Sequence, residues 1–306
     1  MDFIQNILTS FIALVPVTLA QSLILAFVVL GIMIPFRMLN FPDLTSEGAF
    51  PLGGCVCGVM LASGFAAPVA IAGALLAGFV AGSCTAFIHL RFRIHTLLAG
   101  ILMMTMLYSI NLRIMGKSNL SVFGTPTVFD WVPFTTPGFA ASKIIIAGLL
   151  GLLVLIGLNS FFKTEKGTAM RAVGANPDMA EAQGINVWVA TIGGVGLAGA
   201  FSAAGGALMV QSQGFADVNM GLGILINGLA SLMIGEALVG KQTVFRQLLA
   251  PFIGAIVYYQ LVSLCLAAGM PPPDLKLATG LFVLAMLALP SLRRSRGPAP
   301  AREVLR

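Results

Sequence analysis

Long apolar runs recur along the whole of this chain, and they most constrain the fold that it can adopt. Only 9% of its 306 residues are charged, whereas an ordinary soluble domain carries about 25% charged residues. Most of the runs approach the ~20 residues that a helix needs to cross ~30 Å of hydrocarbon. We therefore expect an all-α, polytopic transmembrane bundle of about 8–10 spanning helices.

Nine apolar segments are predicted, with edges accurate to several residues. They lie near residues 10–36, 49–63, 67–90, 94–115, 139–162, 188–212, 221–239, 244–268 and 275–290. No soluble domain fits between them. Residues 1–292 are therefore predicted to form one transmembrane domain with a loop at 163–187, and residues 293–306 a basic tail.

Basic residues gather on one side when these segments are threaded alternately through a bilayer. That side receives Arg91, Arg93, Lys163, Lys166, Arg171, Lys241, Arg246 and the arginines of the tail. The other side receives, outside the first segment, Arg113, Lys117, Lys143 and Lys276. The positive-inside rule makes the first side cytoplasmic, together with the C-terminus. The side of the N-terminus stays open, because residues 1–36 or 37–54 could hold a further half-span.

The chain carries no motif that predicts catalysis, a metal site or a bound nucleotide. Gly235–Gln242 resembles a phosphate-binding loop, but it lacks the Ser or Thr that contacts magnesium and it follows a predicted helix. The cysteines and histidines lack the spacing of metal ligands. The net charge of +6 is explained by membrane orientation, so we expect no nucleic-acid partner. We expect neither an enzyme nor a cofactor, with ATP and Mg²⁺ confined to a partner ATPase.

Residues 163–187 form the longest connection on the predicted cytoplasmic side and contain their own helix signals. Asn176 suits an N-cap, Pro177 the first helical position, and Gly184 the stop after the last turn. These signals define a helix of about seven residues. So short a helix does not persist alone in water. It either docks on the helix ends of its own subunit or inserts into a cytoplasmic partner.

Prolines and carboxylates interrupt the apolar sequence at residues 39–54. A broken backbone at membrane depth survives only against protein or a water-filled cavity. Asp43 and Glu47 are therefore either loop residues at the interface or groups that shape a pathway. Glu236 lies inside another apolar segment, five residues from Lys241, and has the same two interpretations.

Two further patterns each leave two interpretations open. Small residues repeat every four positions at Ala74, Gly78, Gly82 and Ala86, and again at Gly194, Ala198, Ser202 and Gly206. Such stripes allow close helix packing, either within one subunit or at a subunit interface.

On the predicted outer side, residues 116–138 hold the aromatic residues Phe123, Phe129, Trp131 and Phe134. Aromatics at a membrane edge are interfacial anchors or, alternatively here, a docking platform for an external protein.

Taken together, the motifs resemble the branched-chain amino acid type of ABC-transporter permease, most closely its branch associated with tryptophan and tyrosine uptake. The residues that carry the resemblance are Leu39–Thr45, Glu47–Gly48, Leu52–Gly53, Leu97–Leu102, Tyr108–Gly116, Arg171–Gly174, Asn176–Pro177, Gly184–Asn186, Gln213–Asp217, Gly235–Ala237 and Asp274–Leu277.

The resemblance implies the permease fold of an importer in the plasma (inner) membrane of a bacterium. It implies a homodimer with a second copy of the chain, two cytoplasmic ATPase subunits, an extracytoplasmic substrate-binding protein and surrounding membrane lipid. The coupling residues are then Arg171, Gly174, Asn176, Pro177, Glu181, Ala182, Gly184, Ile185 and Asn186. Glu181–Gly184 match the Glu-Ala-Ala…Gly pattern of more familiar importers only in part.

Two further sets of residues complete the predicted site. The candidates for the translocation pathway are Asn40, Asp43, Thr45, Glu47, Phe50, Gln213, Phe215, Asp217 and Glu236. The candidates for docking the binding protein are Phe123, Phe129, Trp131 and Phe134.

The substrate predicted from the resemblance is an amino acid or related small polar solute, with an aromatic amino acid favoured. Because the Arg-Ala-Val-Gly and Gly-Ile-Asn pieces are shared more widely, a sugar or nucleoside permease of the same superfamily is an alternative. A different class would be an ion-coupled secondary transporter that uses Asp43, Glu47 or Glu236 as its ion site.

Overall fold

The computed structural model describes residues 2–131 and 139–271, together with residues 274, 277, 280, 281 and 284. Its long helices are α1 (Asp2–Met33), α3 (Ala67–Phe92), α4 (Thr96–Met115), α5 (Phe139–Phe161), α8 (Val187–Gln213) and α10 (Val244–Ala267). The shorter helices are α2 (Ser46–Ala62), α6 (Glu165–Ala175), α7 (Pro177–Ala182) and α9 (Ile224–Val239). The remaining elements are a π-helical turn η1 (Ile34–Met38), 3₁₀ turns η2 (Val128–Trp131) and η3 (Val218–Gly221), and strands β1 (Asn119–Ser121) and β2 (Phe215–Asp217).

Among the described residues, seven helical segments are long and apolar enough to cross a membrane. Helix α2 is a shorter apolar helix of 17 residues. The predicted polytopic helical bundle is therefore confirmed, and eight of the nine predicted segments correspond to α1–α5 and α8–α10. The ninth segment, residues 275–290, and the tail at 293–306 lie largely or wholly outside the described residues.

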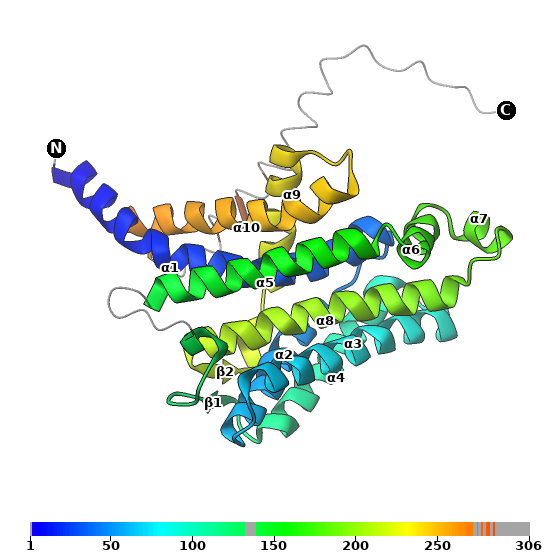
Figure 1. The fold of residues 1–306 in the computed structure, drawn as a ribbon, viewed down its shortest axis with the longest axis horizontal. Helices are drawn as coiled ribbons and strands as arrows, with labels where there is room; N and C mark the ends of the chain where they lie inside the picture. Colours follow the sequence, from blue (N-terminus) through cyan, green and yellow to red (C-terminus); the bar gives the residue numbers. More distant parts are fainter. Residues whose placement is uncertain are drawn as a thin grey trace, which may run out of the picture.

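Helix α8 forms the centre of the bundle (Figure 1). It packs against α1, α2 and α3, while α10 packs along α1 and α9. Helices α6 and α7 lie beyond one end of the long helices, and the β1–β2 pair lies at the opposite end. The two ends of the bundle are therefore built differently, one from a helical connector and the other from a short antiparallel ribbon.

Basic side chains are segregated between these two ends. The end that carries α6 and α7 also carries Arg37, Arg91, Arg93, Lys163, Lys166, Arg171, Lys241 and Arg246, and we call it the basic end. The opposite end, called the far end, carries Arg113, Lys117 and Lys143 among the described residues. Helix α1 begins at the far end and finishes at the basic end.

The contact between α3 and α8 depends on glycine. A Cβ added to Gly78 would collide with the carbonyl oxygen of Gly199, and one added to Gly199 would collide with the carbonyl oxygen of Gly78. One helical turn further on, a Cβ at Gly82 would strike the carbonyl oxygen of Val195. Backbones this close gain dispersion contacts that larger side chains would prevent. The small-residue stripe of α3 thus packs within one chain.

A different face of α8 packs against α1 and α2 in the same way. The hydroxyl of Ser202 donates a hydrogen bond to that of Ser46 at 3.2 Å. A Cβ at Gly206 would collide with the carbonyl oxygen of Phe50 in α2. Both small-residue stripes therefore serve close contacts inside the subunit.

Replacing Gly199 with leucine is expected to force α3 and α8 apart, because the new side chain would meet backbone, which cannot move aside. The cost should reach or exceed the ~3 kcal/mol at the upper end of typical overpacking. Size-exclusion chromatography and thermal unfolding in detergent would measure it. Gly157→Leu on α5 is the matched control, because nothing lies within 4 Å of a Cβ at Gly157. Equal behaviour of the two variants would refute the packing argument.

Candidate functional site

The chain leaves the helical path between α1 and α2. Helix α1 ends in the π-helical turn η1, which contains Pro35, and Asn40 then takes a positive φ of 49°. Asp43 stabilises the start of α2. Its Oδ1 accepts two hydrogen bonds from Thr45, one from the backbone N–H at 2.9 Å and one from the side-chain hydroxyl at 2.5 Å. The hydroxyl oxygens of Thr45 and Thr85 lie 2.8 Å apart.

Asp43 and Thr45 are almost completely buried. Their polar atoms satisfy the broken backbone against α3, and α4 closes over them at Gly100, where a Cβ would come within 2.7 Å of the backbone nitrogen of Leu44. Phe50 is also buried, in a cluster with Ile224 and Leu225. In this conformation these three pathway candidates face protein rather than an open path, because the break needs internal partners.

A second interruption separates α8 from α9. Gly214 (φ 82°) ends α8, the chain passes through β2 and η3, and Gly223 (φ 83°) precedes α9. The two interruptions meet, because Oε1 of Glu47 accepts a hydrogen bond from the backbone N–H of Gly223 at 3.0 Å. A carboxylate at the start of a helix is favoured by the helix dipole. Glu47 in the first turn of α2 thus caps a helix that begins 176 residues later in the chain.

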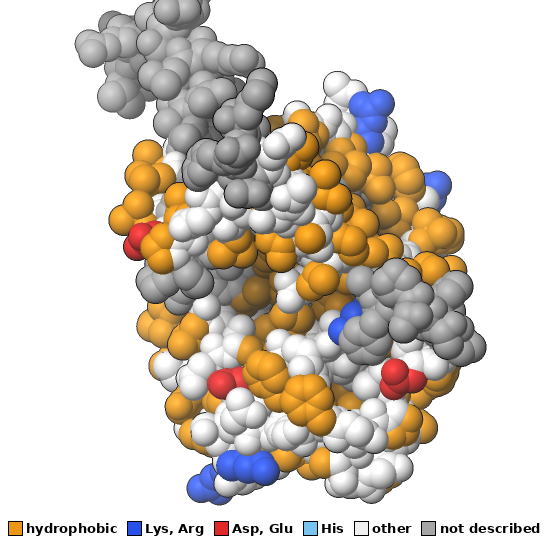
Figure 2. Space-filling model, turned by 90° about the vertical axis from the view of Figure 1, so that its left-hand side faces the viewer, with side chains coloured by type: hydrophobic (Ala, Val, Ile, Leu, Met, Phe, Trp, Pro, Cys, Tyr) orange, Lys and Arg blue, Asp and Glu red, His pale blue; other side chains and the backbone are white. Residues whose placement is uncertain are grey.

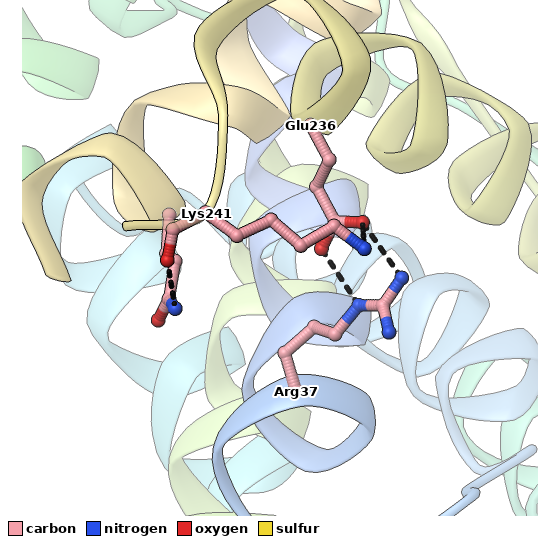
Figure 3. A network of polar contacts seen from close by, with 4 residues as sticks. Arg37, Glu236 and Lys241 are labelled. Carbon is pink, nitrogen blue, oxygen red and sulfur yellow. Dashed lines mark hydrogen bonds and ion pairs between the residues drawn. The ribbon is translucent and has the colours of Figure 1, made fainter. Parts of the chain in front are cut away.

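Glu236, near the end of α9, lies in an ion network at the basic end (Figure 3). Its Oε1 lies 2.6 Å from Nε of Arg37, and its Oε2 lies 2.6 Å from the Arg37 Nη2 and 2.9 Å from Nζ of Lys241. The side chain of Glu236 is 4% exposed, whereas those of Arg37 and Lys241 are 39% and 56% exposed. The network joins η1 to α9.

This pairing bears on the ion-coupled alternative, in which Glu236 would serve as the ion site. An ion-coupled transporter needs carboxylates in the membrane that are available to the coupling ion. Glu236 instead has two cationic partners, one of them bidentate, which is the stronger arrangement for an arginine–carboxylate pair. Its geometry is that of a structural or gating contact.

Glu236→Gln is expected to destabilise the protein, because Arg37 and Lys241 would lose the carboxylate that they share. We expect a loss of about 1–3 kcal/mol, below the 3–5 kcal/mol of a fully buried pair because both cations are partly exposed. Unfolding in detergent would measure it. Arg246→Gln, which changes an exposed arginine bound only to Gln242 among the described contacts, should stay within about 0.5 kcal/mol of the wild type.

A double-mutant cycle with Arg37→Gln separates the pair from its surroundings. Glu236→Gln should cost at least about 0.5 kcal/mol less in the Arg37→Gln background than in the wild type. Additive effects would show that the ion pair contributes nothing to stability.

The connector between α5 and α8 consists of two helices. The predicted short helix is α7, whose N-cap Asn176 accepts a hydrogen bond from the backbone N–H of Met179 at 3.1 Å, and Gly184 follows it with φ 81°. It has six residues where about seven were predicted. The preceding helix α6 was missed, although Thr164 followed by Glu165 is a start signal and Gly167, Met170 and Val173 give it a buried face.

Helix α7 docks on its own subunit, which is one of the two predicted modes of attachment. Ala180 is buried, and Ile185 packs against the same cluster, which also contains Leu39 and Val173. Asp178, Met179, Glu181 and Ala182 are exposed on the other side. The helix is therefore held by its own subunit while it presents a free face beyond the basic end.

Helix α6 contacts the broken end of α1 directly. A Cβ on Gly174 would collide with the carbonyl oxygen of Met38. The connector thus touches η1, and η1 carries the Arg37 that binds Glu236. A continuous set of contacts runs from α7 through α6 and η1 to α9.

The far end is organised by the β1–β2 ribbon. Asn119, Leu120 and Ser121 pair with Asp217, Ala216 and Phe215 in antiparallel register. The side chain of Gln213 donates to the carbonyl of Phe215 at 2.8 Å. A pocket of about 560 Å³ lies beside the ribbon, lined by residues 122–127, Asp130 and residues 211–214.

The aromatic residues of the far end divide into two groups. Phe123 and Trp131 are 74% and 66% exposed. On the side of the molecule drawn in Figure 2, hydrophobic side chains are widespread and charged ones are scattered. Phe129 is only 2% exposed, so its assignment to a docking surface was wrong. Its ring lies in a hydrophobic core cluster with Met115, Val122 and Leu208, and the neighbouring backbone N–H of Val128 donates to the buried Gln211 at 3.0 Å. Phe134 lies outside the described residues.

Comparison with known proteins identifies the family. The family described as branched-chain amino acid transport system / permease component matches residues 16–289. The chain belongs to this family. It is therefore a multi-pass membrane permease of an ABC transporter, which is a transport subunit and not itself an enzyme. Membership implies association with an ATPase and a binding protein.

Several curated proteins are similar to this permease. A tyrosine transport system permease protein of Clostridioides difficile (strain R20291) is 38% identical over 90% of this chain and 91% of its own length. An uncharacterized protein of Rickettsia prowazekii (strain Madrid E) is 33% identical over 90% and 96%. A galactofuranose transporter permease protein of Escherichia coli (strain K12) is 24% identical over 82% and 72%. No solved structure matches.

The nine pathway candidates of this permease do not form one site. Asn40 and Glu236 lie toward the basic end, and Glu47 and Phe50 lie where α2 meets α9. Gln213, Phe215 and Asp217 lie at the far end, and Asp43 and Thr45 are buried in the first break. Sequence reasoning missed Arg37 as the partner of Glu236, because no local spacing relates residues 199 positions apart. No cluster of potential metal ligands occurs in the described part of the chain.

Proposed function

We propose that this permease imports an aromatic amino acid, tyrosine first, across the plasma (inner) membrane of a bacterium. The similarity to a tyrosine transport system permease over nine-tenths of both chains carries the proposal. The sugar permease is less similar, at 24% identity, and a nucleoside ABC transporter permease protein of Lactococcus lactis subsp. cremoris (strain MG1363) is 29% identical over only 56% of this chain. Both are less favoured.

In the proposed orientation the basic end faces the cytoplasm. The positive-inside rule supports it, because most described basic residues lie at that end. The N-terminus, where α1 begins at the far end, would then lie outside. Residues 275–290 would cross the membrane once more after α10 and bring the C-terminus into the cytoplasm.

In the proposed assembly two copies of the permease form a homodimer that binds two ATPase subunits. The exposed face of α7 would dock on an ATPase, and Phe123 and Trp131 would contact the substrate-binding protein at the far end. The full coupling set is Arg171, Gly174, Asn176, Pro177, Glu181, Ala182, Gly184, Ile185 and Asn186. ATP and Mg²⁺ would bind to the ATPase alone.

The mechanism follows from the contacts between the connector and the broken helices. ATP shifts the inward-open and outward-open populations only through its different affinity for the two. Closure of the ATPase pair would pull α7, and α6 would move η1 through the Gly174–Met38 contact. The Arg37–Glu236 pair would carry this movement to one end of α9, while Glu47 holds the other end. The path would then open or close around α2 and α9.

Gly184→Val is expected to lower uptake and substrate-stimulated ATP hydrolysis together. A β-branched residue at φ 81° is strained, and nothing lies within 4 Å of the new Cβ, so the effect comes from the backbone and not from a clash. Asn176→Ala removes a cap worth ~1 kcal/mol and should act more weakly. ATPase activity of the reconstituted complex, with and without loaded binding protein, is the measurement. Uptake and substrate-stimulated hydrolysis should fall together while insertion is retained.

The control for this test is Gly157→Val, at an exposed position of α5. Normal stimulation and transport in the Gly184→Val complex would show that α7 is an ordinary surface helix and would end the coupling assignment.

The substrate proposal is tested by uptake into proteoliposomes that contain the permease, its ATPase and its binding protein. We expect ATP-dependent uptake of labelled tyrosine, competed by phenylalanine or tryptophan and not by galactofuranose or a nucleoside. If only the sugar or only the nucleoside competed, the substrate of the permease would belong to that class instead. Concentrative uptake by this chain alone, driven by a proton or sodium gradient, would refute the importer itself.

A further inference from the structure

A long apolar groove runs along the outside of the bundle from the basic end. It has a volume of about 540 Å³ and lies along one face of α8, bordered by Phe79 of α3 and by Phe161 at the end of α5, with α6 across its end. One face of α8 forms the floor through Val189, Ala190, Gly193 and Leu197, and Phe161 and Met170 form the walls. The groove exists because Ala190 and Gly193 are small.

The dimensions of the groove match one leaflet of a bilayer. Its lining along α8 extends from Asn186 to Leu197, which is about 16 Å at the rise of an α-helix. Half of a ~30 Å hydrocarbon core is about 15 Å. A groove of this length that opens toward hydrocarbon must be filled by apolar groups, because the side chains of its walls would lose their dispersion contacts if it were empty.

The charges of the groove lie only at its mouth. Lys166 and Glu165 border it on α6, and Lys163 is exposed immediately before that helix. The described lining deeper than Asn186 consists of apolar residues. Lys163 and Lys166 together outweigh Glu165, so the mouth has one net positive charge, and a ligand that fits this distribution has an apolar chain and an anionic head at the membrane surface.

We infer that this groove binds an anionic phospholipid of the leaflet at the basic end. One acyl chain lies along α8 over Gly193, and the phosphate of the headgroup contacts Lys166. Basic pockets between membrane helices recognise anionic headgroups in this way. The groove borders Asn186 and α6, so the lipid contacts the connector that leads to α7. The binding site does not depend on which solute the permease carries.

The test is a lipid titration of the purified transporter complex in detergent, followed by native mass spectrometry. Phosphatidylglycerol and phosphatidylcholine are the probes. We expect the permease to bind phosphatidylglycerol several-fold more tightly. Lys166→Gln should weaken that preference about fivefold, the contribution of one cation near a membrane surface. Gly193→Leu should abolish binding of both lipids, since the leucine fills the floor while its Cβ approaches only the flexible end of Met170, at 3.3 Å.

Two matched variants serve as controls. Arg246→Gln removes another exposed basic residue of the same end, and Gly157→Leu adds the same side chain to a lipid-facing position of α5. Neither should change lipid binding. Equal affinity for the two lipids, or unchanged binding in the Gly193→Leu variant, would overturn the proposal. If Gly193→Leu instead reduced self-association with lipid binding intact, a second copy of the chain would be the occupant, and the proposal would equally be wrong.

Discussion

A broken helix in a bilayer leaves backbone groups that lipid cannot hydrogen-bond. This permease has two such interruptions, and its arrangement follows from the groups that bond to the backbone there. The first interruption is closed by Asp43, which accepts from both the backbone and the hydroxyl of Thr45. The second begins a new helix at Gly223, whose backbone N–H donates to Glu47 of the first. The first break also uses the hydroxyl of Thr85 in α3, and the second uses Glu47 of α2, so neither α2 nor α9 could be positioned alone.

Glycine makes these long-range contacts possible. Helix α8 approaches α3 at Gly199 and α2 at Gly206, and in both places a Cβ would meet a carbonyl oxygen. Apolar side chains gain little by leaving lipid, so close backbone packing has to provide the attraction between helices. The same small residues leave the groove at Gly193 open. Small residues thus produce both the tight interior and the apolar groove on the outside of the bundle.

The sequence predicted the parts of this structure that depend on local chemistry. Apolar length located α1–α5 and α8–α10, and the cap and stop residues Asn176 and Gly184 located α7. It did not predict the parts that depend on distant partners. One partner of Glu236 is Arg37, 199 residues away in the chain, and Phe129 lies in a core cluster with residues of other helices, so local spacing could predict neither environment. Helix α6 was missed for a different reason, since its start signal and buried face lay in a stretch taken for a loop.

The β1–β2 ribbon has a consequence for how the subunit can change shape. Its paired strands follow α4 and α8 directly, and they join the far ends of these two helices through backbone hydrogen bonds. Two rigid helices that are joined at one end can move apart only by rotating about the point where they are joined. A small rotation at the ribbon therefore becomes the largest displacement at the opposite tips of α4 and α8, where α8 begins next to α7. If α4 and α8 separated in this way, the ribbon would be the pivot, and the connector lies at the end of α8 farthest from it.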